Sequence, residues 1–145
     1  MTRVKGAVGP DAHVLALTGL VLEHFRDLVA EEDWGGLRSS HFRVLGHVPG
    51  EGVTITELAD RLGMTKQGCG QFVTGMVELG LVETGQDPGD RRVRLVTLTE
   101  RGRRMNERFE RRVAEVEQEW AQRVGPRRYA TFRAVLAELA PQPRG

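Results

Sequence analysis

The chain has 145 residues, of which 39% are apolar and 28% charged, with a net charge of +1, so we expect one compact unit. No apolar run approaches the roughly 18–20 residues that a membrane helix needs, and residues 1–10 lack the apolar core of a secretion signal. The single cysteine excludes an internal disulfide and is typical of a reducing compartment, so we expect a cytoplasmic protein.

The N-terminal quarter is predicted to form a loose arm over residues 1–10 and a long helix from Asp11 to Glu32. Apolar side chains cover nearly every direction around this helix: Val14, Leu15, Leu17, Leu20, Val21, Leu22, Phe25, Leu28 and Val29. Such a helix must be covered on more than one side, and a second molecule is a plausible cover. Trp34-Gly35-Gly36 then breaks the helix, and a second helix is predicted from Ser39 to Val48.

The central stretch predicts a short strand and two short helices. Gly52 to Thr54 is compatible with a strand, and Thr54 with Glu57 three residues later is typical of a capping box. Gly63 is placed to end the first helix, and the second is predicted from Thr65 to Leu79. Its apolar face comprises Cys69, Phe72, Val73, Met76 and Val77, and its polar face Lys66, Gln67, Gln71 and Thr74. Two short helices around a tight glycine turn indicate a helix-turn-helix, whose second helix can enter a DNA major groove.

A hairpin and two further helices are predicted to follow. Leu81–Thr84 and Val93–Leu98 favour strands, and Asp87-Pro88-Gly89-Asp90 predicts a type II turn with glycine at the position of positive φ. A helix from Glu100 to Val124 is expected after Thr99. Its apolar residues recur at spacings of 4, 4, 3, 4 and 4, a narrow coiled-coil-like stripe: Met105, Phe109, Val113, Val116, Trp120 and Val124. Gly125-Pro126 stops this helix, and a last helix is predicted from Arg128 to Leu139.

The charges divide unevenly along the chain. Residues 1–60 carry 5 basic and 9 acidic side chains, whereas residues 61–104 carry 8 and 5, and residues 105–145 carry 8 and 6. The basic excess therefore begins with the second helix of the helix-turn-helix and the hairpin, where a phosphate backbone would lie.

The motifs of this central region resemble those of the MarR family of winged helix-turn-helix regulators. The matching motifs are Asp90-Arg91-Arg92, Val96-Thr97-Leu98-Thr99, Gly102, Leu58-Ala59, Leu62-Gly63-Met64-Thr65-Lys66-Gln67 and Leu79-Gly80-Leu81-Val82. The resemblance implies a mainly α fold with a small β-hairpin wing. Residues 1–36 would form the N-terminal arm and dimerisation helix, residues 37–99 the DNA-binding lobe, and residues 100–145 the rest of the dimerisation region.

The same resemblance implies a homodimer on a near-palindromic double-stranded DNA operator, and repression relieved by a small, often phenolic, ligand. It places the subunit contact on the first helix and the last two. The expected contact residues are Val14, Leu17, Val21, Val113, Val116, Trp120, Phe132 and Leu136. The apolar surface of the first helix and of the stripe independently exceeds what the lobe can cover.

DNA contacts are expected from the second helix and the hairpin tip: Thr65, Lys66, Gln67, Gly70, Gln71, Thr74, Arg91 and Arg92. Gln67 and Gln71 are one turn apart, and glutamine can bond adenine bidentately, whereas Thr65 and Lys66 suit phosphate. Arginine is favoured in a narrow minor groove. We expect Asp90 to pair with one wing arginine and aim the other; the family pattern favours Arg91 as the probe, but the assignment is open.

The second helix departs from the family pattern at Gly68, Gly70 and Gly75. Each costs about 1 kcal/mol relative to alanine in a helix interior and offers no side chain to read a base. Direct readout should therefore be weaker, with more weight on the wing. The alternative is a winged-helix dimer that serves as a protein-interaction module with little specific DNA binding.

A ligand pocket between lobe and dimerisation region is predicted from His24, Trp34, His41, Leu45, Met105 and Phe109. The alternative is ordinary interhelical core. A zinc site at His24, His41 and His47 lacks ligand spacing, and Cys69 lies on an apolar face where a thiol acts as a small hydrophobe rather than a redox switch. No phosphate loop or catalytic grouping indicates an enzyme, and we expect no cofactor.

Overall fold

The computed structural model describes residue 9 and residues 11–142. In chain order the elements are α1 (Val14–Val29), α2 (Ser39–Leu45), β1 (Val53–Thr54), α3 (Ile55–Leu62), α4 (Lys66–Glu78), β2 (Val82–Asp87), β3 (Asp90–Leu98), α5 (Glu100–Val124) and α6 (Pro126–Leu139). The mainly α fold with a small β-wing is confirmed. The predicted N-terminal arm falls on residues that lie, apart from Gly9, outside this description.

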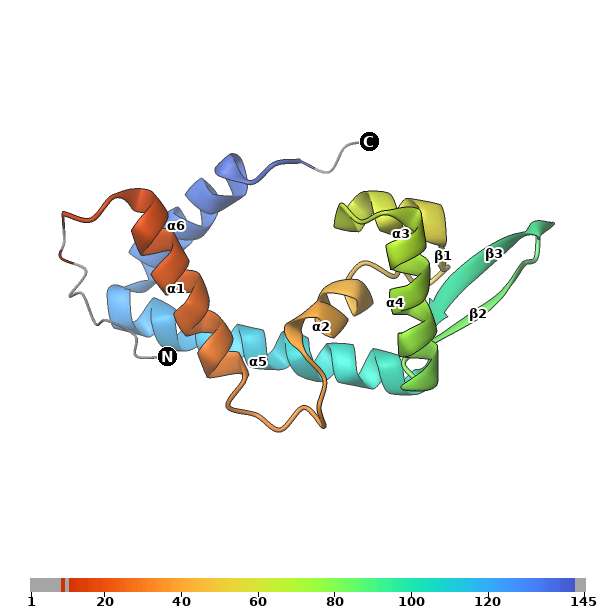
Figure 1. Ribbon diagram of the computed structural model, residues 1–145. Coiled ribbons are helices and arrows are strands. Elements are labelled where there is room, and N and C mark those ends of the chain that lie inside the picture. Colours follow the sequence, from red (N-terminus) through yellow and green to blue (C-terminus); the bar gives the residue numbers. More distant parts are fainter. Residues whose placement is uncertain (1–8, 10, 143–145) are drawn as a thin grey trace, which may run out of the picture.

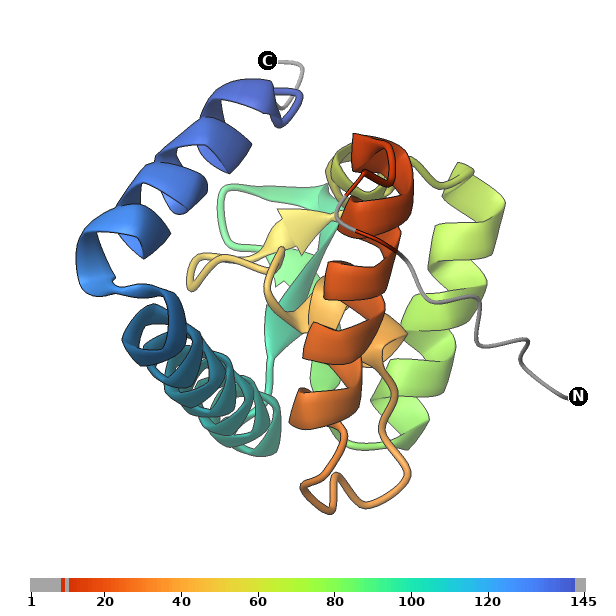
Figure 2. The ribbon, with the colours of Figure 1, turned by 90° about the vertical axis from the view of Figure 1, so that its left-hand side faces the viewer.

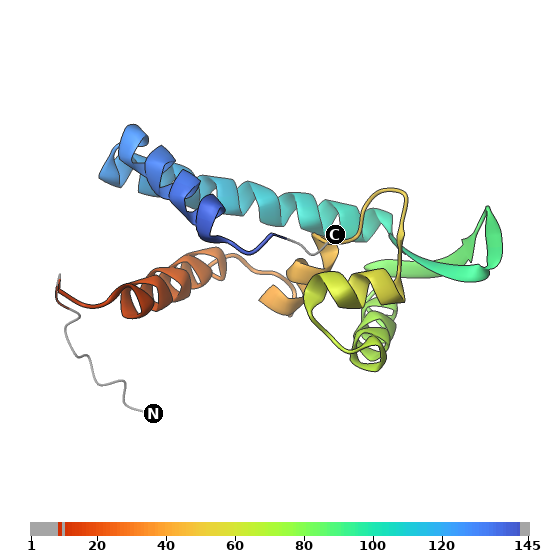
Figure 3. The same cartoon turned by 90° about the horizontal axis from the view of Figure 1, so that it is seen from above.

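Helix α5 is the long rod on which the rest of the chain is arranged (Figure 1). The lobe, made of α2, α3, α4 and the sheet, lies at the N-terminal end of α5, and the hairpin of β2 and β3 projects beyond that end. Helices α1 and α6 lie toward the other end, as Figure 3 also shows, and Figure 2 looks along α5 from that end. Among the described residues, no helix is both long and apolar enough to cross a membrane.

The sheet has the order β1–β3–β2 and is antiparallel throughout. Val53 lies opposite Val96, and Val82 lies opposite Leu98, so the inner ends of the strands meet in the core. The short strand predicted before the first lobe helix is confirmed. Both hairpin strands run further toward the tip than predicted, because the backbone ladder continues through glycine and mostly exposed polar or charged residues whose strand propensity is weak.

The ends of several helices differ from the sequence prediction. Helix α1 stops at Val29 rather than Glu32, and α2 stops at Leu45 rather than Val48. Helix α6 begins at Pro126, since proline at the first helical position loses no intrahelical hydrogen bond. The Thr54 hydroxyl caps α3 by accepting from the Glu57 N–H at 3.1 Å, but the described residues show no return bond from the Glu57 carboxylate, so the capping box is only half formed.

The apolar stripe of α5 is mostly covered by its own chain. Val116 is fully buried, and Phe109, Val113 and Trp120 are half-buried against the same core. The rings of Phe42 and Phe109 stack with centroids 4.4 Å apart, which joins α2 to α5. The expectation that Val116 contacts a second subunit is therefore wrong, because helical periodicity shows that a face is buried but not which chain buries it.

Candidate nucleic-acid interface

The turn between α3 and α4 has the geometry that its sequence predicts. Gly63 ends α3 in the left-handed conformation, with φ 65°, and the Met64 N–H donates to the Ala59 carbonyl at 2.9 Å. The Thr65 hydroxyl then caps α4 by accepting from the Gly68 N–H at 3.0 Å. Both ends of the turn are thus satisfied by short-range bonds, which fixes α4 relative to α3.

Helix α4 presents one face to the core and the other to solvent. Cys69, Val73 and Met76 are buried, whereas Val77, predicted on the apolar face, is 41% exposed. The residues expected at DNA are exposed apart from the half-buried Gly70: Thr65, Lys66, Gln67, Gln71 and Thr74. The Thr74 hydroxyl donates to the Gly70 carbonyl at 3.0 Å, so its proton is directed at the helix itself. Gln67 and Gln71 are the longest uncharged polar side chains on this face.

The three glycines of α4 have different surroundings. A Cβ on Gly68 would lie 2.9 Å from the Thr65 hydroxyl, so glycine permits the close N-cap bond. A Cβ on Gly70 or Gly75 would meet nothing within 4 Å. Packing within this chain therefore does not require glycine at these two positions, and their effect is to leave part of α4 without side chains.

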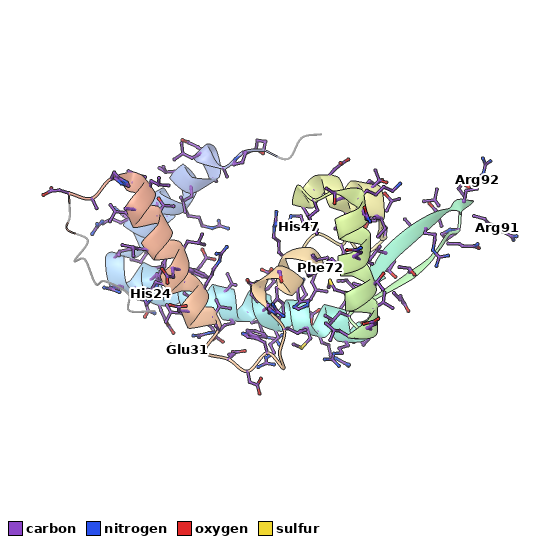
Figure 4. All side chains as sticks on the ribbon, in the orientation of Figure 1. His24, Glu31, His47, Phe72, Arg91 and Arg92 are labelled. Atoms are coloured by element: carbon purple, nitrogen blue, oxygen red, sulfur yellow. The ribbon has the colours of Figure 1, made fainter. Side chains whose placement is uncertain are left out.

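The hairpin tip carries the two wing arginines, which project into solvent away from the lobe (Figure 4). The Asp90 carboxylate accepts from the Arg92 N–H at 3.0 Å and lies 3.8 Å from the Arg92 Nε. The predicted pairing of Asp90 with one arginine is confirmed, and the partner is Arg92. Because the Arg92 side chain is 94% exposed, this ion pair is weak and leaves the guanidinium accessible.

The turn at the tip is not of type II. Gly89 has no positive φ, which a type II turn requires at that position. Instead, the Asp87 carboxylate accepts from the Gly89 N–H at 2.8 Å, and the register shifts between Gln86 and Asp87. The side-chain bond of Asp87 organises the turn without the left-handed conformation that proline and glycine suggested.

At the base of the wing, the first turn of α5 lies close to the backbone at the start of the hairpin, which the sequence analysis did not predict. The Thr99 hydroxyl donates to the Gly80 carbonyl at 2.6 Å and accepts from the Gly102 N–H at 3.0 Å. A Cβ on Gly102 would lie within 2.0 Å of the Leu81 carbonyl oxygen. Glycine at this position therefore lets the first turn of α5 pack directly against the start of the hairpin. The sequence offered one signal of this close packing, a glycine within the first turn of a predicted helix.

The residues predicted for a ligand pocket do not form one cluster. Trp34 and Phe109 line a cavity of about 320 Å³ between α1, α2 and α5. His24 lies instead in a cavity of about 590 Å³ next to α6, where its ring stacks on Trp120. Leu45 is core, Met105 packs against the core, and His41 contacts Phe72 of α4, with ring centroids 5.5 Å apart.

The smaller cavity is aromatic with charged side chains in its lining. Phe42 lies between Trp34 and Phe109, and Arg26, Asp27 and Arg38 also line the cavity. Sequence reasoning missed both arginines, because they lie outside the apolar pattern and reach the cavity only through tertiary packing. An aromatic wall with basic side chains suits a planar anion.

The larger cavity adjoins the most exposed apolar surface of the chain. Of the predicted interface residues, five are at least 38% exposed: Val14, Leu17, Val21, Phe132 and Leu136. Tyr129 lines this cavity and donates to the Glu117 carboxylate at 2.8 Å. Burial and this hydrogen bond raise the pKa of Tyr129 to about 12, so its hydroxyl remains protonated at neutral pH.

Two alternatives from the sequence remain, a redox switch at Cys69 and a zinc site. Cys69 is buried, and burial raises the pKa of its thiol, which lowers its reactivity. The described part of the chain contains no group of three or more His, Cys, Asp or Glu side chains that could hold a metal ion.

Known proteins resemble this chain over most of its length. A family model described as MarR family matches residues 36–93, from the end of the α1–α2 connection to β3. The HTH-type transcriptional regulator PetP of Rhodobacter capsulatus is 32% identical over 141 residues, which cover 90% of this chain and 77% of that protein. An uncharacterised protein of Mycobacterium tuberculosis is 31% identical over 115 residues, which cover 79% of this chain and 78% of that protein.

Two solved structures share the fold. CouR from Rhodococcus jostii, bound to p-coumaroyl-CoA, superimposes with a TM-score of 0.65 and 25% identity, over 90% of this chain and 92% of that one. A variant of MarR from E. coli, in complex with operator DNA, gives a TM-score of 0.69 at 24% identity, over 87% and 92% of the two chains.

Proposed function

Because this chain belongs to the MarR family of transcription regulators, we propose that it is a homodimeric repressor that leaves a near-palindromic operator when a small aromatic ligand binds. The observation that carries the proposal is the exposed polar face of α4 beside a hairpin with two exposed arginines at its tip.

Operator binding would use the two elements differently. Gln67 and Gln71 lie on the exposed face of α4 and would contact base edges, while Thr65 and Lys66 at its start would contact phosphate. We assign the minor groove to Arg91, because the Asp90 carboxylate 3.8 Å from the Arg92 Nε would bring negative charge toward DNA together with Arg92. That a MarR variant of the same fold is in complex with operator DNA supports DNA as the partner of this lobe.

The second subunit would cover the exposed apolar surface of α1 and α6. Val14 and Leu139 are each 75% exposed, and Leu15 is 80% exposed, which is unusual for a chain that stands alone in water. A twofold axis through this surface would place one lobe on each half-site of a palindrome.

The effector would bind in the cavity between α1, α2 and α5. Its wall of Trp34, Phe42 and Phe109 suits an aromatic ring, and Arg26 and Arg38 suit an anionic group. The p-coumaroyl-CoA bound to CouR supports an aromatic acid or its thioester as the chemical class to test first.

The test uses the variant Gln71→Ala with a matched control. Gln118 is also exposed but lies on α5, outside the proposed DNA face, so Gln118→Ala makes the same chemical change elsewhere. We expect Gln71→Ala to weaken binding to a footprinted operator by about tenfold or more, because a bidentate contact contributes about 1–3 kcal/mol. Equal affinity of Gln71→Ala, Gln118→Ala and the parent chain would contradict the assignment.

A second candidate function, a protein-interaction module, is favoured by Gly70 and Gly75, which leave part of α4 bare. It predicts a stable dimer with only weak, sequence-independent DNA affinity. A footprint on a defined site would exclude it.

A further inference from the structure

Helix α1 ends without a glycine, and side chains from elsewhere satisfy its last carbonyl groups. The Trp34 indole N–H donates to the Val29 carbonyl at 2.9 Å. The Arg112 guanidinium, from the middle of α5, donates to the Leu28 carbonyl through Nη2 at 2.8 Å and Nε at 3.3 Å. A cation at a helix C-terminus is favoured by the helix dipole, so this contact is charge-assisted.

One turn earlier on α5, Arg108 holds the segment that follows α1. Its Nε lies 3.2 Å from the Glu32 carboxylate, and its Nη2 donates to the Asp33 carbonyl at 2.9 Å. The same guanidinium lies 4.6 Å from the centre of the Trp34 ring. Arg108 and Arg112 together, here named the arginine clamp, thus fasten residues 28–34 to α5.

The bonds of the clamp to backbone carbonyls should hold residues 28–34 on α5 more strongly than its exposed ion pairs do. Arg112 also lies 3.5 Å from the Glu31 carboxylate and 3.1 Å from that of Glu115, but both carboxylates are largely exposed. Figure 4 shows Glu31 at the end of α1, next to α5. The Arg112 side chain itself is only 12% exposed, so its bonds to the Leu28 carbonyl are shielded from water.

The position of the clamp gives it a mechanical role. The lobe is connected to the α1 and α6 end of the molecule by α5 and by the segment between α1 and α2 (Figure 1). The lobe also packs on α5 through the stack of Phe42 on Phe109. The clamp adds a second contact, at the α1 end of the connecting segment, which would limit rotation of the lobe about that stack.

We propose that Arg108 and Arg112 are positioning residues that set the angle between the lobe and the dimerisation helices. The proposal rests on the proposed function, because this angle would fix the distance between the two α4 helices on an operator. Trp34 contacts the clamp residue Arg108 and also lines the smaller cavity, so a ligand that moves Trp34 would also disturb the clamp.

The test measures the lobe angle directly, without DNA. Spin labels are attached at Gln118→Cys on α5, on the side of the helix away from Val116, and at Asp60→Cys on α3, both exposed sites, in a Cys69→Ala background. The doubly labelled chain is mixed with an excess of unlabelled chain, and pulsed electron resonance gives the distribution of distances within one chain. Arg108→Gln and Arg112→Gln remove the clamp.

Arg111→Gln is the matched control, because Arg111 is exposed on the same helix and lies outside the clamp. We expect a distance distribution about twofold wider, or shifted by several ångström, in both clamp variants but not in the control. Arg112→Lys should restore part of the narrow distribution, since lysine keeps one charged donor but not the planar fork. Unchanged distributions in the clamp variants would overturn the proposal, even if their melting temperatures fall, because a merely stabilising role would lower stability alone.

A DNA experiment then separates this proposal from the proposed function. One base pair inserted between half-sites rotates and displaces them, so the parent chain should lose about tenfold in affinity or more, whereas Arg112→Gln should lose about threefold or less. Equal losses in the two chains would contradict the positioning role. A parent chain that binds no specific duplex would contradict the proposed function, while the distance measurement would still decide on the clamp.

Discussion

Replacement of Gly102, in the first turn of α5, by alanine should strongly destabilise the contact between α5 and the base of the hairpin. The added Cβ would lie 2.0 Å from the Leu81 carbonyl oxygen, whereas ordinary contact begins at 3.4 Å, so α5 and the hairpin base would have to separate by about 1.4 Å. That movement would also strain the bonds of Thr99 to the Gly80 carbonyl and the Gly102 N–H. Overpacking typically costs about 1–3 kcal/mol, and we expect at least the upper end because a backbone oxygen is the obstacle.

Urea unfolding at a fixed protein concentration measures this effect, with Gly75→Ala as the control. Gly75 lies within α4, has no positive φ, and has nothing within 4 Å of the site of a Cβ, so alanine there should stabilise the chain by about 0.5–1 kcal/mol. Opposite signs for the two glycine-to-alanine changes are therefore expected. A Gly102→Ala protein as stable as the parent would refute the close approach described for the wing base.

Burial, and then the charge of Arg38, lower the pKa of His41 below its usual 6.5. The stabilising contribution of neutral His41 is therefore present above pH 6.5 and is lost as the pH falls through the folded-state pKa. In thermal melts, His41→Asn should lose less stability on acidification than the parent chain. Cys69 should resist alkylation in the folded chain at about pH 8 and react in urea, as mass spectrometry would show, whereas rapid labelling of the folded chain would contradict its burial. Arg91→Ala should lower the slope of log affinity against log salt by about 2, about 1 for each subunit of the proposed homodimer, in an anisotropy titration, and an unchanged slope would remove Arg91 from the DNA contacts.

The helix-turn-helix and α5 could be predicted from the sequence because local signals set their ends. The predicted α5, from Glu100 to Val124, matches the structure, since Thr99 caps its start and Gly125 follows its end. Gly63 and Gly80 both adopt the positive φ expected after a helix. The end of α1 was placed too late, because the Leu28 carbonyl accepts from the side chain of Arg112, 84 residues away, which no local signal reveals. The bond from the Trp34 indole N–H to the Val29 carbonyl is local, but it involves a side chain read as a helix breaker only for the glycines beside it.

In the candidate site, too, features set by local sequence were predicted and features set by tertiary packing were not. The exposed face of α4 follows from helical periodicity, and the pairing of Asp90 with an arginine follows from adjacency in a turn. The cavities do not follow from either, because their lining depends on how α1 packs against α5 and α6. His24 and Trp34 therefore line different cavities, although both were expected in one pocket.

The most direct test of the account is the affinity of the full chain for a labelled duplex from the region upstream of its own gene. Fluorescence anisotropy across a salt series, with a scrambled duplex as control, gives both the specificity ratio and the number of phosphate contacts. Operator recognition predicts specific binding at least about 10³-fold tighter than control binding, with a steep salt slope. If both duplexes were bound with equal affinity, and only at low salt, operator recognition at that site would be contradicted. Gly70 and Gly75 of α4, which offer no side chain to DNA, would then be the first positions to examine.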